Sequence, residues 1–254
     1  MVDEAVSDFG IARSDGSSEV SQLAFDHRAD LASHLRRLIN AVVAGRIPDE
    51  EFASAAELVS KAADALDSVA EEGRRPRPMP DLSSKGADLF PTSPMMGKFN
   101  PLSPPIQVEI ENGVVRGTAT FGYPYEGPPT CVHGGVLALA FDELLGAANF
   151  LSGAPGMTGT LTVKYHKPTP LLTPLRLEAK VVRREGRKIF TWGGVYDGDT
   201  LTAEAEGLFI QVLADRFIEM VISRDDGGRS LEQLKADAKE TGSVGRFRRE
   251  ADSP

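Results

Sequence analysis

The sequence predicts an α+β fold in which an antiparallel sheet curves around one long, buried helix, and two observations lead to this prediction. First, residues 134–151 have the length of a helix, and the stretch VLALAF within them is apolar on every side, so this helix should be enclosed. Second, two segments with strand-like alternation precede this helix and four follow it. Strands joined by short turns pair antiparallel, so the helix should pack against one sheet.

The N-terminal part of the chain is predicted to be helical and separate from this sheet. Residues 1–20 are rich in Ser, Asp and Gly, which is typical of a disordered N-terminus. Residues 21–73 contain two groups of apolar side chains at helical spacing, separated by Gly45 and Pro48. This pattern predicts an antiparallel helical hairpin whose apolar stripes serve packing, and we assign no chemistry to it.

Residues 74–105 are predicted to form a Pro-rich extended linker that wraps a surface. Eight of the seventeen prolines lie between residues 73 and 105. This density is incompatible with a regular helix or a central strand. The stretch SPMMGKFNP could line a pocket, although packing is the simpler role.

The sheet is predicted to occupy residues 106–213. Its first two strands, IQVEI and VVRGTATFG, lie on either side of Asn112-Gly113, which is a strong hairpin signal. Residues 214–254 hold one weak amphipathic pattern and are expected to form a peripheral tail. The four strands after the helix are expected to form a meander in chain order, at residues 157–167, 174–186, 188–197 and 200–213.

The composition excludes several classes of protein. The formal net charge of -9 is unlike the basic surface of a general nucleic-acid binder. No apolar run approaches the roughly 20 residues that cross a bilayer, and the acidic start of the chain lacks an apolar signal segment. Cys131 is the only cysteine, so no intramolecular disulfide can form, and we expect a cytoplasmic protein.

One region departs from this acidic balance. Residues 160–190 contain eight Lys or Arg side chains against two Glu, a local net charge of +6. Such a run is either a solvated strand face or a binding surface for a small polyanion. The residues alone leave both interpretations open.

The predicted central helix begins with His133-Gly134-Gly135. Glycines at a helix N-terminus leave its unpaired N–H groups accessible, and the helix dipole adds partial positive charge there. Together these features can hold the developing oxyanion of an acyl-transfer reaction. Alternatively, the glycines only permit a tight turn or close packing.

Asp142 and Glu143 interrupt the apolar run of this helix. An unpaired carboxylate in an apolar environment costs several kcal/mol, so something must compensate for it or use it. A partly desolvated carboxylate suits a general base. Alternatively, both side chains lie on an exposed strip of the helix, and the residues alone do not separate Asp142 from Glu143 as the candidate base.

The spacing of His133 and Asp142 bears on the oligomeric state. Nine residues of helix correspond to about 900° of rotation and about 13 Å of rise, so the two side chains cannot meet within one helix. If they share a site, two copies of the helix must lie side by side and antiparallel, as a two-fold dimer allows. A shared site therefore requires a dimer with two composite sites.

Four blocks of residues 106–213 resemble the hotdog-fold acyl-CoA thioesterases of the PaaI-like and THEM4-like group. The matching blocks are YEGPPTCVHGGVLALAFDELLG, GMTGTLTVKYHKPTPL, EGRK and EAEGLFI, in that order. The resemblance implies a sheet wrapped around a central helix, a homodimer or dimer of dimers, and hydrolysis of acyl-CoA without a metal or redox cofactor. It leaves residues 1–105 and the tail unexplained.

The resemblance also implies roles for individual residues. Asp142 takes the position of the catalytic carboxylate, as general base on water or as direct nucleophile. The Gly135 N–H would hold the thioester carbonyl oxygen, His133 would orient or polarise the site, and Thr158 would position the attacking water. The stretch that binds CoA in the family corresponds to four basic residues, namely Arg187, Lys188, Lys164 and Lys167.

Three alternatives stay open at this level. The chain could be a hotdog acyl-CoA hydratase or dehydratase, a non-catalytic acyl-CoA-binding protein, or a structural protein whose helical hairpin binds a partner. Cys131 and His133 are too close in sequence to favour a nucleophilic dyad, and a small buried Cys is the simpler role. No cluster of residues has convincing zinc spacing.

Overall fold

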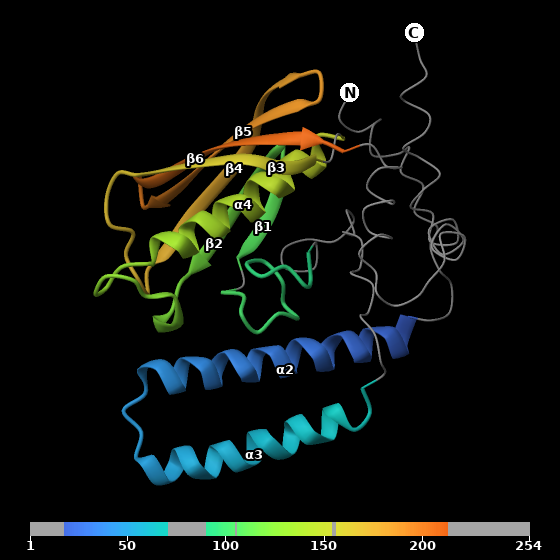
Figure 1. The fold of residues 1–254 in the computed structure, drawn as a ribbon, viewed down its shortest axis with the longest axis vertical. Coiled ribbons are helices and arrows are strands. Elements are labelled where there is room, and N and C mark those ends of the chain that lie inside the picture. Colours follow the sequence, from blue (N-terminus) through green and yellow to red (C-terminus); the bar gives the residue numbers. More distant parts are fainter. Residues whose placement is uncertain (1–17, 71–89, 105, 154–155, 213–254) are drawn as a thin grey trace.

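The computed structural model describes residues 18–70, 90–104, 106–153 and 156–212. Its main body is a six-stranded antiparallel sheet that curves around the helix α4 (Gly134–Leu151), and two further helices lie outside this body (Figure 1). This arrangement confirms the predicted α+β fold and its N-terminal helical pair. The predicted disorder of residues 1–17 and the tail from residue 214 onward lie outside the described residues.

The strands of the sheet are β1 (Gln107–Glu111), β2 (Val114–Thr120), β3 (Gly156–Tyr165), β4 (Pro174–Glu185), β5 (Lys188–Asp197) and β6 (Thr200–Gln211). Their order is β1-β2-β4-β5-β6-β3, and every pair is antiparallel. The predicted four-strand meander is therefore wrong for β3, which pairs with β6 at the far edge. Pairing β4 with β2 joins the first hairpin to the same sheet, which gives α4 one continuous surface to pack against.

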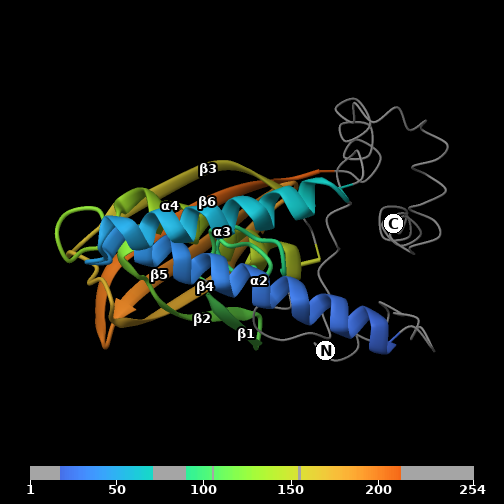
Figure 2. The ribbon, with the colours of Figure 1, turned by 90° about the horizontal axis from the view of Figure 1, so that it is seen from below.

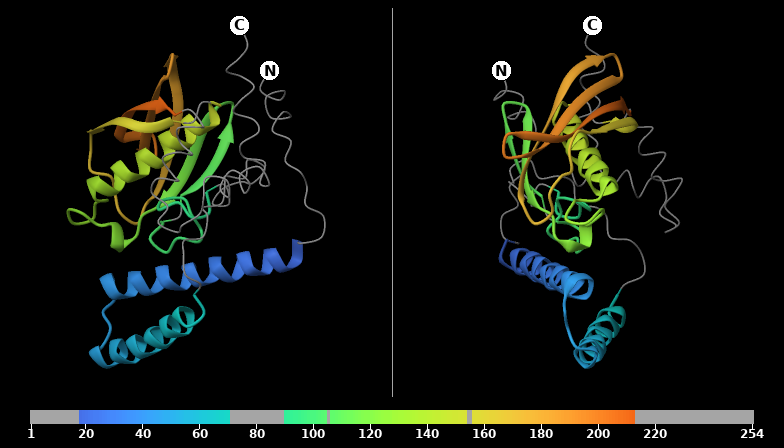
Figure 3. Two further views of the ribbon diagram at one scale, coloured as in Figure 1. Left: turned by 45° about the vertical axis from the view of Figure 1, so that its right-hand side comes forward. Right: turned by 90° about the vertical axis from the view of Figure 1, so that its left-hand side faces the viewer.

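Helix α4 packs into the concave side of the sheet (Figure 3). Two glycines of the sheet make room for it: a Cβ on Gly193 or Gly207 would lie 3.2 or 3.1 Å from a methyl carbon of Leu145. The absence of side chains at these two positions lets the helix approach the sheet backbone. The core side of α4 consists of Leu137, Ala140, Phe141, Leu144, Leu145, Ala147, Ala148 and Asn149.

Helix α4 has a composition that needs explanation. Among the described residues, it is the one helix that is long and apolar enough, by length and composition, to match a membrane span. The helix contacts five strands of the sheet, from β2 to β6. Its apolar character follows from this position as the core helix of the domain.

Residues 90–104 lie within the predicted linker and pack closely against the core. They form successive turns, in which Ser93 N–H donates to Phe90 O at 3.0 Å and the Gly97 N–H donates to Ser93 O at 3.0 Å. Met95 and Met96 are buried in the same apolar cluster as α4. The segment is thus part of the folded domain rather than a strand of chain on its surface.

The helices α2 (Ser18–Ala44) and α3 (Asp49–Asp67) run antiparallel, with α2 between α3 and the sheet domain (Figures 1 and 2). Helix α2 begins three residues inside the segment that was expected to be disordered. It lies against the short 3-10 helix η2 (Tyr123–Tyr125). Its Arg36 guanidinium donates to the carbonyl oxygens of Asn100 at 3.1 Å and Lys98 at 3.4 Å.

Candidate functional site

His133 is the N-cap of α4, and its side chain accepts a hydrogen bond from only one of the two glycines that follow it. The Gly135 N–H donates to His133 Nδ1 at 3.0 Å, while the N–H groups of Val136 and Leu137 donate to the His133 carbonyl oxygen. The Gly134 N–H makes no hydrogen bond to any residue that the structure describes. At the start of α4, therefore, the predicted donor Gly135 is occupied and Gly134 carries the free N–H group.

The loop before α4 fixes His133 in this position. The His133 N–H donates to Tyr125 O at 2.9 Å. Gly127 lies so close that a Cβ there would come within 2.7 Å of His133 Cα. Thr130 has a φ of 66°, a left-handed conformation that costs a β-branched residue about 1–3 kcal/mol. Its N–H donates to Glu126 Oε1 at 2.8 Å, so the surrounding contacts hold the strained loop in place.

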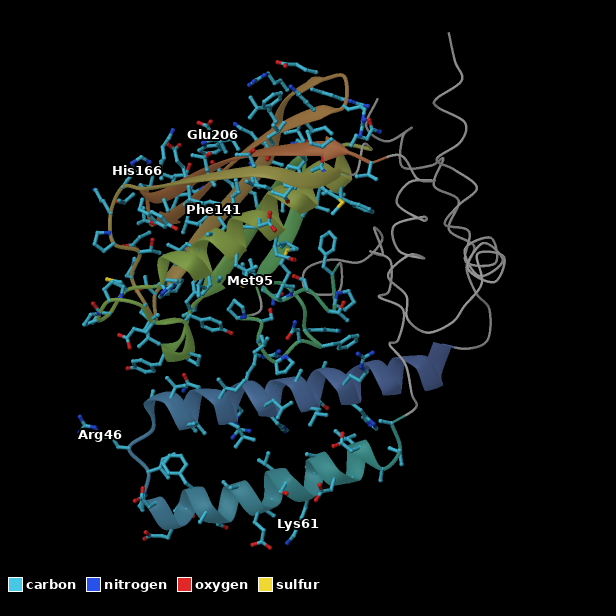
Figure 4. All side chains as sticks on the ribbon, in the orientation of Figure 1. Arg46, Lys61, Met95, Phe141, His166 and Glu206 are labelled. Carbon is cyan, nitrogen blue, oxygen red and sulfur yellow. The ribbon has the colours of Figure 1, made fainter. Side chains whose placement is uncertain are left out.

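A pocket of about 380 Å³ opens beside the start of α4. Tyr165, at the end of β3, donates its hydroxyl to Gly134 O at 2.7 Å and forms one wall of the pocket. Gly134 lines the pocket and Gly135 does not. His166 lies at the same end of the sheet (Figure 4). The other lining residues are Pro128, Cys131, Val132, Leu137, Lys167, Pro168 and Thr169.

Asp142 is half-buried on the side of α4 that faces β3. Thr158 Oγ1 donates to Asp142 Oδ1 at 2.8 Å, so the structure brings these two predicted site residues together. The pairing of β3 with β6 shifts between Thr158 and Thr160, and such a bulge re-aims the side chains beside it. Asp142 Oδ2 makes no hydrogen bond to a described residue, so it is available to a water or a substrate.

Glu143 has a different partner from Asp142. Its Oε2 accepts a hydrogen bond from Ser93 Oγ, across the domain from β3. Ser93 is fully buried, and its hydroxyl oxygen also accepts the Met95 N–H at 3.2 Å and the Met96 N–H at 3.0 Å. The structure therefore separates the two carboxylates. Ser93 carries no motif in the sequence, so sequence reasoning had no signal for this contact.

The less buried face of α4 carries Gly135, Leu139, Asp142 and Gly146, which we call the open strip, and Asp142 lies at the edge of this strip beside β3. These residues recur every three or four positions, so they share one face of the helix. Leu139 is 40% exposed although it is apolar. His133 and Asp142 belong to the same helix, nine residues apart, and one chain does not bring them together.

The four predicted CoA-binding residues fall into two groups at opposite ends of the sheet. Lys164 of β3 lies opposite Glu204 of β6. Lys188 of β5 lies opposite Ile210 of β6, which is six residues farther along that strand. Six residues of strand span about 20 Å. Lys167 follows Lys164 by three residues and lines the pocket, and Arg187 directly precedes Lys188, so a single chain does not gather all four.

Carboxylates on β6 engage the first of these groups. Lys164 Nζ lies 3.4 Å from Glu206 Oε1 and 3.6 Å from Glu204 Oε1, and the bond to Glu206 is the main cause that raises the pKa of Lys164. Trp192 Nε1–H donates to Glu204 Oε2 at 3.0 Å and is the main cause that lowers the pKa of Glu204. His166 Nε2 lies 3.2 Å from Glu204 Oε1.

Arg187 of the second group is also engaged. Its guanidinium donates twice to Gln211 O, at 3.2 and 3.1 Å. Within the described ranges, no three His, Cys, Asp or Glu side chains converge in a group that could hold a metal ion. The candidate site therefore consists of the helix start, the open strip with Asp142, and two separated basic groups.

Residues 130–206 match the model of a family described as the thioesterase superfamily. This range includes the start of α4, Asp142 and both basic groups. The acyl-coenzyme A thioesterase THEM4 of Xenopus laevis is 43% identical over 93 residues, 35% of this chain and 41% of that protein. The protein of the same name from Bos taurus is 36% identical over 94 residues, 36% of this chain and 38% of that protein. The chain thus spans about two fifths of the length of these curated relatives.

A solved structure extends the likeness beyond the sheet domain. The crystal structure of a protein described as a thioesterase superfamily member shares 36% sequence identity and a TM-score of 0.65 with this chain. The match covers 72% of this chain and 94% of the other. With that relative covered almost end to end, the chain belongs to the thioesterase superfamily, and its curved sheet around α4 is the hotdog fold.

Proposed function

We propose that the protein is an acyl-CoA thioesterase, which hydrolyses a CoA thioester to a free carboxylic acid and CoA. The observation that carries this proposal is Asp142, which Thr158 holds through one oxygen while the other oxygen stays open. Membership of the thioesterase superfamily and the names of the THEM4 relatives support the same reaction.

The oxyanion donor in this proposal is the Gly134 N–H. Gly135, the donor that the resemblance implies, already gives its N–H to His133 Nδ1. The Gly134 N–H has no hydrogen-bond partner among the described residues, and Gly134 lines the pocket at the positive end of the α4 dipole. His133 then acts by fixing the helix start rather than by touching the thioester.

The reaction needs Asp142 and Gly134 in one place, and we propose that a two-fold dimer supplies this arrangement. Leu139 and the two glycines of the open strip offer a surface for a second antiparallel α4. Strand β3 is an edge strand of the sheet, and its outer edge pairs with no strand among the residues that the structure describes. Met157 at its start is 48% exposed and Tyr165 at its end is 53% exposed, as expected for a strand that a second copy covers.

The dimer also brings the two basic groups together. In an antiparallel arrangement, the Asp142 end of one protomer meets the Gly134 end of its partner. The pair Arg187 and Lys188 of one protomer would then approach the pair Lys164 and Lys167 of the other. Arg and Lys side chains suit the phosphate oxygens of CoA, so each composite site would gain all four predicted residues.

In the proposed mechanism, Asp142 accepts a proton from water, and the resulting hydroxide attacks the carbonyl carbon of the thioester. The carbonyl oxygen takes up negative charge beside the partner's Gly134 N–H. When the intermediate collapses, the C–S bond breaks and the CoA thiolate receives the proton from Asp142. Direct attack by the carboxylate, followed by hydrolysis of the anhydride, would use the same geometry.

The test is release of free CoA thiol from a panel of acyl-CoAs, from acetyl to palmitoyl and including phenylacetyl. We expect turnover by the native chain and a loss of at least about a hundredfold in kcat for Asp142→Asn. The matched control is Asp197→Asn, the same substitution at the exposed last residue of β5, which should keep native turnover. Equal turnover by Asp142→Asn and the native chain would contradict the proposal.

A further inference from the structure

We propose that Ser93 is a positioning residue for the thioesterase site, which acts through Glu143 to set the rotation of α4 and thereby the aim of Asp142. The inference rests on the proposed function and goes beyond it, because it makes residues 90–104 part of the catalytic machinery. We call the hydrogen bond from Ser93 Oγ to Glu143 Oε2 the tether.

The hydroxyl of Ser93 has one possible orientation. Its oxygen accepts two backbone N–H groups, from Met95 and Met96, and its single proton goes to Glu143. Ser93 is fully buried, so no water competes for the hydroxyl. The bond to a charged acceptor is also stronger than a neutral one. The tether is therefore a rigid, directional contact between α4 and the turn at residue 93.

The tether and the bond to Asp142 hold α4 on two sides. Consecutive helix residues point about 100° apart, so Asp142 faces β3 while Glu143 faces residues 90–104. Thr158 fixes the first side and Ser93 fixes the second. The open strip lies between these two polar contacts. A rotation of α4 that moves Asp142 away from its aim must break at least one of them.

A second contact on the Glu143 side supports this role. Phe150 follows Glu143 by seven residues, which is two turns, so both face the same segment. Its ring packs edge-on against Phe90, with 6.4 Å between ring centroids. Residues 90–96 thus flank α4 over two turns, and Met95 and Met96 anchor them in the core.

The far end of this segment is held by α2. Phe99 N–H donates to Pro91 O at 2.8 Å, which closes the loop that carries Ser93. Arg36 of α2 donates to the Asn100 carbonyl oxygen at 3.1 Å. A continuous set of contacts therefore runs from α2 through the 90–104 loop to Glu143, the neighbour of Asp142.

Loss of the tether has a definite consequence. In Ser93→Ala, the half-buried Glu143 carboxylate loses its hydrogen-bond donor, which is unfavourable unless the side chain turns toward solvent. The helix loses one of its two polar contacts, and Asp142 loses its fixed aim. Displacement of a reacting group by about 1 Å can cost up to about a hundredfold in rate.

The experiment measures kcat and KM for thioester hydrolysis in Ser93→Ala, Glu143→Ala and the double variant. We expect each single variant to lower kcat about tenfold with little change in KM, and the double variant to lose no more than one single variant. Glu143→Gln keeps an acceptor for the Ser93 hydroxyl and should restore kcat to within about threefold of native.

A control variant distinguishes the loss of Asp142 positioning from a general loss of fold stability. Val108→Ala removes buried volume from β1, away from the open strip, and should lower Tm while kcat is unchanged below that temperature. Native kcat in Ser93→Ala would overturn the proposal. So would a multiplicative loss in the double variant, or an equal kcat loss in Val108→Ala at the same drop in Tm.

A second readout is independent of catalysis. Amide hydrogen exchange of residues 139–146 should be faster in Ser93→Ala and Glu143→Ala than in the native chain, and native-like in Glu143→Gln. If the native chain releases CoA from no thioester, the proposed function fails, and the exchange rates still decide whether the tether holds α4. Unchanged exchange in both alanine variants would overturn the tether.

Discussion

Gly134 and Gly135 differ in what their N–H groups do, although the sequence presents them as a pair. The sequence supplies a reason for glycine at a helix start, namely access to the N–H groups. It does not show which N–H the cap residue uses, because that depends on the rotamer of the His133 ring. The assignment of the oxyanion donor to Gly134 therefore comes from the contact between Gly135 N–H and His133 Nδ1.

Proline at position 134 tests this assignment cleanly. Gly134 is the first residue of α4, where proline fits a helix, and His133 has a ψ of 132°, which proline accepts in the preceding residue. Gly134→Pro thus removes the N–H and leaves the helix intact. We expect its kcat to fall about 10²- to 10³-fold, as for the loss of one oxyanion donor.

The matched control is Gly134→Ala, which keeps the N–H. Its Cβ would lie 3.4 Å from the Tyr165 ring, an ordinary contact, so we expect kcat within about threefold of native. Steady-state kinetics on the best acyl-CoA measure both variants. Native kcat in Gly134→Pro would return the donor role to Gly135.

Asp142 and Glu143 are adjacent in the sequence, and their different hydrogen-bond partners distinguish them. The sequence identifies two adjacent carboxylates in an apolar helix, and the resemblance selects the first. The structure supplies the physical difference, because Thr158 reaches Asp142 and Ser93 reaches Glu143. A partner fifty residues earlier in the chain has no local signal, so Ser93 could not be predicted.

At the scale of elements, local patterns predicted most of the fold. The central helix, the first hairpin and the β4–β6 meander follow from periodicity and turn residues, and the structure confirms them. The place of β3 could not be predicted, because alternation identifies a strand and not its neighbour. The packing of residues 90–104 against the core could not be predicted either, because proline density indicates irregular backbone and says nothing about burial.

The outer face of the sheet provides a pH prediction. Trp192, His166 and Lys164 stabilise the charged form of Glu204 and lower its pKa. A lowered carboxyl pKa adds stability above the usual Glu value of about 4.3, and this stability disappears as pH falls through the folded-state pKa. Trp192→Phe removes the main cause and should destabilise the chain at neutral pH.

The difference in unfolding free energy between native chain and Trp192→Phe should therefore shrink as pH falls below about 4. Denaturant unfolding at several pH values measures it. The control Trp192→Phe/Glu204→Gln should show a gap from its Glu204→Gln parent that does not change with pH. A native-to-Trp192→Phe gap that stays constant from neutral to acid pH would contradict the prediction.

At the scale of the whole molecule, three features of one chain point to a second copy. The open strip of α4 leaves Leu139 exposed, and β3 has a free edge. The basic groups at residues 164–167 and 187–188 lie at opposite ends of the sheet. Spacing along one helix predicts that His133 and Asp142 come from different chains if they share a site, and the single chain keeps them apart.

The central claim is that Asp142 of one protomer and the Gly134 N–H of its partner form one thioester-hydrolysing site. The most direct test co-expresses Asp142→Asn and Gly134→Pro chains under different affinity tags and purifies the mixed dimer. Each variant alone should be nearly inactive, whereas the mixed dimer has one site with both defects and one native site. The account predicts about half of native kcat per dimer for the mixture; activity no higher than that of the two parent variants would contradict it.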